Sequence, residues 1–86
     1  MCICTPPPLH RIMAVDSLDA GAHVLLEKPM AISLADCDAM IEAARRSRRV
    51  LAVAAQNRYR SEYWRVRELI RSGVCGNILS MRAESA

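Results

Sequence analysis

The chain has 86 residues, of which 52% are hydrophobic and 24% charged, and its formal net charge is +3. This length provides material for one small domain and excludes a large self-sufficient enzyme. The composition is that of a globular protein, which excludes an intrinsically disordered chain.

The first predicted strand is the apolar run of residues 1–5, which ends at the prolines of residues 6–8 because proline lacks the N–H that a central strand donates. Residues 9–20 then have apolar side chains at roughly helical spacing, and Gly21 follows where a left-handed helix cap is expected. They predict a helix of about three turns. The candidate core residues on this helix are Ile12, Val15 and Leu18.

A second apolar run, residues 23–26, predicts a strand that ends at Glu27-Lys28-Pro29. Ser33 followed by Asp36 resembles a capping box, and it predicts a second helix from Leu34 to about Arg49. The apolar stripe of this helix consists of Leu34, Cys37, Met40, Ile41 and Ala44.

Residues 50–55 form a third apolar run, and polar residues begin abruptly at Gln56-Asn57-Arg58. Ser61 is the expected N-cap of a third helix over residues 62–72, and residues 78–84 alternate weakly, as a half-buried strand does. The residues of the third helix available for burial are Trp64, Val66, Leu69 and Ile70.

The alternation of strands and helices predicts an α/β fold with a parallel sheet and right-handed crossovers. The first three strands are near-continuous apolar runs, which is typical of strands buried on both faces, so we expect helices on both faces of the sheet. Each of these strands ends in a polar or proline-containing segment. Because ligands of open parallel sheets bind at the carboxyl ends of the strands, one site could use all three segments.

The remaining composition argues against other classes of function. The dense basic cluster of residues 45–49 lies away from the aromatic residues, so we expect no nucleic-acid partner, and no apolar segment is long enough for a membrane partner. Four cysteines without C-x-x-C spacing make a zinc site improbable, and we expect no metal. Free thiols suit a reducing compartment, which predicts a cytoplasmic location.

The order of these motifs resembles the amino-terminal domain of the Gfo/Idh/MocA family of oxidoreductases, and the resemblance spans essentially the whole chain. The residues that carry it are Thr5-Pro6-Pro7 with His10, Ala20-Gly21-Ala22-His23-Val24-Leu25-Leu26-Glu27-Lys28-Pro29-Met30-Ala31, Asn57-Arg58-Tyr59, Arg67-Glu68-Leu69-Ile70, Gly73 and Gly76-Asn77-Ile78.

The resemblance implies a partial Rossmann-like parallel sheet of about three βα units plus the first strand of a following α+β domain. Residues 1–76 would be the carboxy-terminal half of a dinucleotide-binding Rossmann domain, and residues 77–86 would begin the substrate domain. It also implies NAD or NADP as cofactor, a small-molecule sugar or polyol substrate, and hydride transfer between them. The Gly-x-Gly-x-x-Gly turn that binds the pyrophosphate does not occur in these residues.

The resemblance places Lys28 beside the nicotinamide as the catalytic residue, where it would orient the substrate hydroxyl or help remove its proton. Glu27 would hydrogen-bond the ribose or hold Lys28. The alternative for Lys28 is an ordinary surface lysine, and the alternative for Glu27 is an ordinary charge at the end of a strand.

The other predicted cofactor-binding residues come from different segments. Thr5 and Pro6 would bring backbone against the cofactor, although they also suit simple strand termination. His10 matches a family position near the cofactor, but a histidine in a first helical turn is more often a surface or packing residue. The donor fork of Arg58 suits an oxygen-rich ligand, and a surface ion pair is the alternative.

We therefore expect an inactive fragment of an NAD(P)-dependent oxidoreductase. The unpaired edge of residues 2–4 favours association, so a homo-oligomer is a further expectation. The competing hypothesis is a small independent α/β module that dimerises through this edge and performs no redox chemistry.

Overall fold

The computed structural model describes residues 1–84, and the chain divides into two compact units, Met1–Ala55 and Gln56–Ala86. The elements of the first unit are β1 (Cys2–Ile3), the 3₁₀ turn η1 (Pro7–Leu9), α1 (His10–Asp19), β2 (Val24–Leu26), α2 (Leu34–Ser47) and β3 (Leu51–Val53). The elements of the second unit are the 3₁₀ turn η2 (Gln56–Tyr59) and α3 (Ser61–Arg71).

The three strands form one parallel sheet in the order β1-β2-β3, as the alternation of strands and helices predicts. Ile3, Leu26 and Val53 lie opposite one another in this register. The pairing continues past the strand ends, because the N–H of Glu27 donates to the Ile3 oxygen at 2.9 Å and the N–H of Ala54 to the Leu26 oxygen at 2.8 Å. All three strands therefore end along one edge of the sheet.

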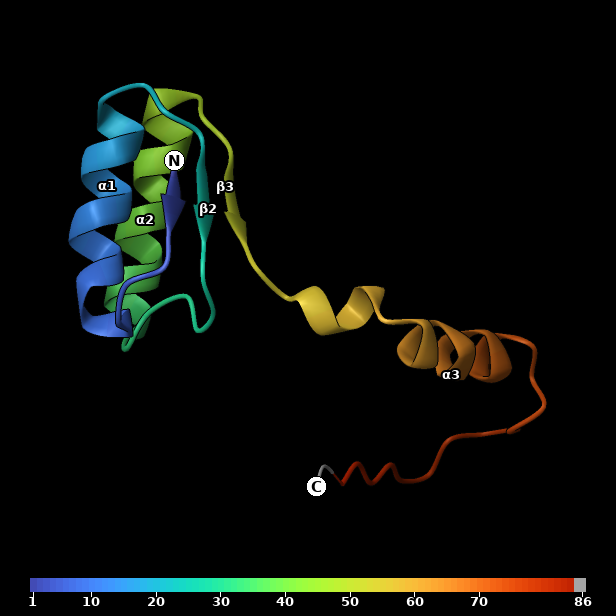
Figure 1. Ribbon diagram of the computed structural model, residues 1–86. Coiled ribbons are helices and arrows are strands. Elements are labelled where there is room, and N and C mark those ends of the chain that lie inside the picture. The colour runs from blue at the N-terminus through green and yellow to red at the C-terminus, as the bar shows by residue number, and fades with distance from the viewer. Residues whose placement is uncertain (85–86) are drawn as a thin grey trace. The chain divides into compact units, whose positions relative to one another are not determined.

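Helices α1 and α2 lie side by side against the same face of this sheet (Figure 1). The expectation of helices on both faces is wrong for residues 1–55, and Leu25 is accordingly 48% exposed between buried neighbours. The physical reason is that both crossovers are right-handed and each adds a strand on the same side of the previous one, which returns both helices to one face. The core between the layers consists of Ile3, Ala14, Leu18, Val24, Leu26, Met40 and Ala43.

The first helix buries part of the predicted apolar stripe, because Leu18 is buried and Val15 packs against the core. Its buried residues are His10, Ala14 and Leu18, which are spaced by four and lie on one face. Ile12 is 61% exposed, because this spacing turns it away from the sheet. The left-handed position after the helix is confirmed, since Gly21 has a φ of 92°.

The second helix begins where the capping pattern predicts. The Ser33 hydroxyl accepts a hydrogen bond from the Asp36 N–H at 3.2 Å. The helix ends at Ser47 because Arg48 adopts the left-handed conformation, with a φ of 54°. Only Met40 of the predicted stripe is fully buried, while Leu34 is 83% exposed because it starts the helix at the rim of the unit.

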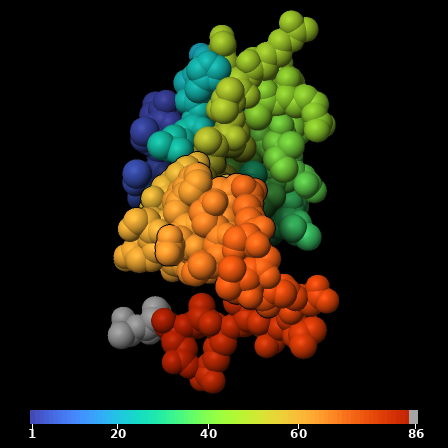
Figure 2. All heavy atoms as spheres, turned by 90° about the vertical axis from the view of Figure 1, so that its right-hand side faces the viewer, coloured from blue at the N-terminus to red at the C-terminus, as the bar shows by residue number. Residues whose placement is uncertain are grey.

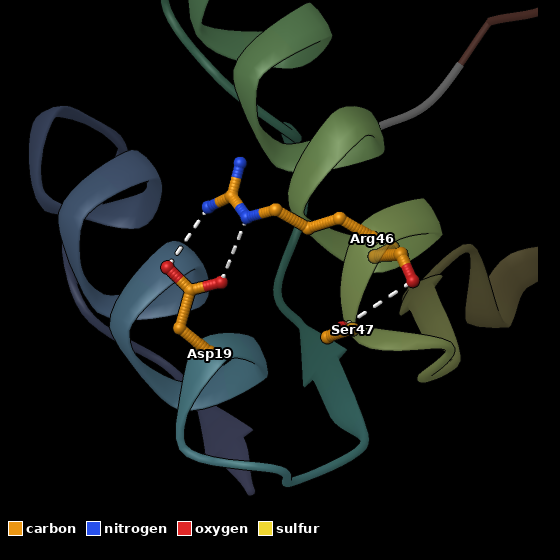
Figure 3. A network of polar contacts seen from close by, with 4 residues as sticks. Asp19, Arg46 and Ser47 are labelled. Atoms are coloured by element: carbon orange, nitrogen blue, oxygen red, sulfur yellow. Dashed lines mark hydrogen bonds and ion pairs between the residues drawn. The ribbon is translucent and has the colours of Figure 1, made fainter.

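An ion pair joins the carboxyl ends of α1 and α2 (Figure 3). Arg46 donates through Nε to Oδ1 of Asp19 at 3.1 Å and through Nη2 to Oδ2 at 2.8 Å. This hydrogen bonding is the main cause that raises the pKa of the Arg46 guanidinium, and desolvation opposes it. Both side chains are about half exposed, so salt screens the pair and its contribution to the free energy of unfolding is small.

The second unit differs from the predictions at both of its ends. The N-cap of α3 is Arg60, without a side-chain capping bond, and the Ser61 hydroxyl instead donates to the Glu62 carboxylate. Residues 78–84 form no strand, because no strand of the described residues pairs with them. The predicted core residues of α3 are not buried, and Trp64 is 45% exposed. Figure 2 shows the atoms of η2 and α3 as one continuous surface.

All four cysteines are free, and Cys2 and Cys4 are both exposed, as expected for neighbours on one face of a strand. Among residues 1–84, no helix is long and apolar enough to cross a membrane. The same residues contain no group of three or more His, Cys, Asp or Glu side chains that could hold a metal ion.

Replacing Leu18 by Ala should destabilise the first unit, because Leu18 is fully buried between the helices and the sheet. Removing a buried leucine side chain typically costs about 2–5 kcal/mol of unfolding free energy. Ile12→Ala on the exposed face of α1 is the matched control, with an expected change within about 0.5 kcal/mol. Urea denaturation measures both values, and equal effects would contradict the assignment of the helix face.

Acidification should loosen the first turn of α3 through Glu62. A hydrogen bond from its own backbone N–H, and next the charge of Arg60, lower the pKa of Glu62 from its ordinary value of 4.5. Because the folded pKa is the lower one, the carboxylate stabilises the helix above the ordinary value, and this contribution disappears as pH falls through the lowered pKa. Amide NMR spectra of residues 61–65 should follow this titration, which Glu62→Gln abolishes and Glu68→Gln preserves.

Candidate functional site

The candidate site lies at the sheet edge where the three strands end (Figure 1). Because Ile3 and Leu26 are register partners, the segments that follow them start beside each other. This places Thr5 and Lys28 on adjacent loops of the first unit. The third predicted segment, with Arg58, belongs to the second unit.

The loop after β1 is a compact turn. The Leu9 N–H donates to the Pro6 oxygen at 3.0 Å, and Pro7–Leu9 form a single 3₁₀ turn that leads directly into α1. The Thr5 hydroxyl faces the Met13 sulfur at 3.4 Å. The His10 N–H donates to the Pro7 oxygen, so the turn itself supplies an acceptor to the first amide of α1.

The loop after β2 contains the predicted catalytic residue. Glu27 is half-buried and its backbone still belongs to the sheet, whereas Lys28 is exposed. The peptide bond between Lys28 and Pro29 is cis. Within residues 1–84 no carboxylate pairs with Lys28, so its ammonium group is open to a ligand at the strand ends.

His10 connects these two loops. Its side chain is fully buried, with Nε2 at 2.8 Å from the Thr5 oxygen. Nδ1 lies 3.0 Å from the Pro29 oxygen and 3.2 Å from the Met30 oxygen. Both ring nitrogens are thus occupied by backbone carbonyls of the loops on either side of the site.

Arg58 lines an open hollow of about 710 Å³ in the second unit. The other residues of this hollow are Asn57, Tyr59, Tyr63, Trp64 and Arg67. The Arg67 guanidinium lies 5.0 Å from the centre of the Trp64 ring, a cation–π distance. Of the residues that the structure describes, two arginines and no acid line the hollow, so it offers donors and aromatic faces to an oxygen-rich ligand.

The predicted site residues of the first unit therefore lie together, and only Arg58 is in the second unit. Sequence reasoning missed the carbonyl groups of Pro29 and Met30 as partners of His10. No local signal identifies them, because backbone carbonyls carry no residue-specific pattern and these residues are about twenty positions from His10 in sequence. The roles of Thr5, Pro6, His10, Glu27, Lys28 and Arg58 toward a cofactor remain predictions.

Comparison with known proteins identifies the family. The model of an oxidoreductase family with an NAD-binding Rossmann fold, Gfo/Idh/MocA, matches residues 1–55. The chain is 41% identical over 76 residues to 1-carboxy-3-chloro-3,4-dihydroxycyclo hexa-1,5-diene dehydrogenase of Comamonas testosteroni, covering 88% of this chain and 19% of that protein.

Solved structures agree with this result. The aldose-aldose oxidoreductase of Caulobacter crescentus, complexed with glycerol, is 38% identical with a TM-score of 0.81, over 84% of this chain and 22% of that one. The WlbA dehydrogenase of Bordetella pertussis, in complex with NADH and UDP-GlcNAcA, is 34% identical with a TM-score of 0.82, over 88% of this chain and 22% of that one.

The chain thus spans about a quarter or less of the length of the relatives it matches. The matched part has the parallel strands, the crossover helices and the loops at the strand ends described above. On these grounds the chain belongs to the Gfo/Idh/MocA family of oxidoreductases, with an NAD-binding Rossmann fold.

Proposed function

We propose that the protein containing this chain is an NAD(P)-dependent oxidoreductase that transfers a hydride between the nicotinamide and a carbon of a sugar or polyol. The observation that carries the proposal is the exposed Lys28, which has no carboxylate partner among residues 1–84, at the strand-end edge of a parallel sheet. Ligands of open α/β sheets bind at this edge.

The residues at this edge fit the nicotinamide end of a dinucleotide. The backbone of the Thr5-Pro6 turn lies at this edge, and Glu27 offers a carboxylate to a ribose hydroxyl. The glycines of the chain stand at 21, 73 and 76, so residues 1–86 contain no Gly-x-Gly-x-x-Gly turn for the pyrophosphate. The chain therefore suits one end of the cofactor only.

Lys28 would act on the proton that accompanies hydride transfer. As the neutral amine it has a lone pair that can accept the hydroxyl proton while the carbon loses its hydride to the nicotinamide, and the ammonium so formed can return the proton in the reverse direction. The cofactor supplies the hydride acceptor when it is bound. Arg58 would bind an oxygen of the substrate or cofactor through its donor fork.

The substrate class rests on the relatives. The names of the matched proteins include an aldose-aldose oxidoreductase complexed with glycerol and a dehydrogenase complexed with a sugar nucleotide. By analogy, we propose that the substrate of this protein is a polyhydroxylated compound, either open-chain or cyclic. We also propose a cytoplasmic location, which suits four free thiols, and a homo-oligomer.

A chimera tests the catalytic role of Lys28. Residues 1–84 replace the matching segment of the Caulobacter crescentus aldose-aldose oxidoreductase, which covers 84% of this chain. Lys28→Met should lower kcat by about 10²–10⁴-fold, as expected for loss of a general acid–base group. NADH or NADPH affinity should change little, because the rest of the cofactor site is intact.

Arg45→Met is the matched control in this experiment. Arg45 is exposed on α2 and pairs with Glu42, away from the strand ends, so its loss should leave kcat unchanged. Lys28→Arg keeps the charge but not the proton exchange, and it should be almost as slow as Lys28→Met. Full activity of Lys28→Met in a folded chimera would refute the assignment.

The isolated chain should bind dinucleotides poorly, because it lacks a glycine-rich phosphate turn. Titration of NADH into the purified chain, followed by nicotinamide fluorescence, should show no saturation in the micromolar range. Saturable binding would contradict the proposed division of the cofactor site. A chimera inactive with either nucleotide, together with stable dimers of the isolated chain, would favour the alternative of an interaction module.

A further inference from the structure

His10 has an unusual set of partners for a buried histidine. It is fully buried, and every hydrogen-bonding partner of its ring is a carbonyl oxygen. One partner, Thr5, follows β1, and the other two, Pro29 and Met30, follow β2. The ring is therefore the direct link between the two loops of the candidate site.

The number of N–H groups on the ring decides how many loops it can hold. A neutral imidazole has one N–H, so one of its nitrogens would direct a lone pair at a carbonyl oxygen. An imidazolium has two N–H groups, one for Thr5 and one shared between Pro29 and Met30. Only the imidazolium satisfies the geometry on both sides of the ring.

We propose that His10 is a positioning residue: as an imidazolium it fastens both the Thr5 loop and the Pro29–Met30 loop to the first turn of α1, and on losing a proton it releases one of them. The inference deepens the proposed function, because the second loop carries Lys28. The fastening itself does not require a cofactor, so it can be tested without one.

The charged residues near His10 make no hydrogen bond to its ring within residues 1–84, so the ring contacts backbone carbonyl groups only. Arg11, the next residue of α1, pairs with Asp36 of α2 at 3.7 Å. Glu27 and Lys28 precede the Pro29 carbonyl in the loop after β2. Among residues 1–84, no hydrogen bond or ion pair joins a charged side chain to the His10 ring.

His23 provides an internal contrast. The N–H of Val50 donates to Nδ1 of His23 at 2.9 Å, so this nitrogen must keep its lone pair. His10 needs a proton on both nitrogens to make its contacts, whereas His23 makes its contact only without a proton on Nδ1. The two histidines of the chain therefore have opposite requirements.

The test is a pH titration of the unmodified chain by NMR, which observes the ring nitrogens and the carbonyl carbons of Thr5, Pro29 and Met30. At the acidic end, both His10 nitrogens should carry protons. As pH rises, one nitrogen should lose its proton, and the carbonyl signals on that side alone should shift with the same midpoint. His23 should keep an unprotonated Nδ1 wherever the Val50 contact persists.

Two results would overturn the proposal. One is a His10 ring that stays in a single neutral tautomer throughout the folded range. The other is a ring that titrates while all three carbonyl signals stay constant. Both concern the chain without cofactor, so neither depends on whether the proposed oxidoreductase activity is correct.

Variants separate the fastening from general stability. His10→Gln should abolish the coupled titration at Thr5 and Met30 and shift the signals of both loops, while the signals near Val50 remain. His23→Gln is the matched control and should give the opposite pattern. If His10→Gln fails to fold, the titration of the unmodified chain still decides, because it needs no substitution.

Discussion

The parallel pairing of β1, β2 and β3 in one register is the constraint on which the rest of the first unit depends. Parallel strands need crossover connections, and right-handed crossovers in one direction bring α1 and α2 to the same face. The same pairing ends the three strands at one edge. The parallel hydrogen bonding of the strands therefore determines both the core and the candidate site. The core forms where the helices pack on one face of the sheet, and the site forms where the loops meet at one edge.

The loops at the carboxyl ends of β1 and β2 are held by hydrogen bonds to His10, and not by the apolar core. The two loops after β1 and β2 contain prolines and have few backbone donors, so their carbonyl groups need a donor from elsewhere. His10 supplies it from within α1, at the start of the buried stripe that continues through Ala14 and Leu18. One face of α1 therefore has two roles. Ala14 and Leu18 pack against the sheet, and His10 contacts the loops.

The alternation of apolar runs and helical spacing predicted the element order, because both follow from local periodicity. Gly21 and Ser33 were predicted correctly as helix boundaries for the same reason, since caps depend on residues only a few positions apart. Burial was predicted less well: Ile12 and Leu34 are exposed because the partner of a helix face depends on tertiary packing. The clustering of Thr5 and Lys28 followed from topology, while the partners of His10 required coordinates.

The face of the sheet away from α1 and α2 limits the stability of residues 1–55. Parallel sheets are normally covered on both faces, yet Leu25 is 48% exposed between Val24 and Leu26, which are both buried. Hydrophobic burial in this unit therefore comes from a single interface, and a unit of this size buries a modest share of its surface. Under that constraint the polar contacts weigh more than in a larger domain. The buried His10 contacts link the first turn of α1 to the two loops, Leu18 packs between the helices and the sheet, and the half-exposed Asp19–Arg46 pair lies at the far end of α1.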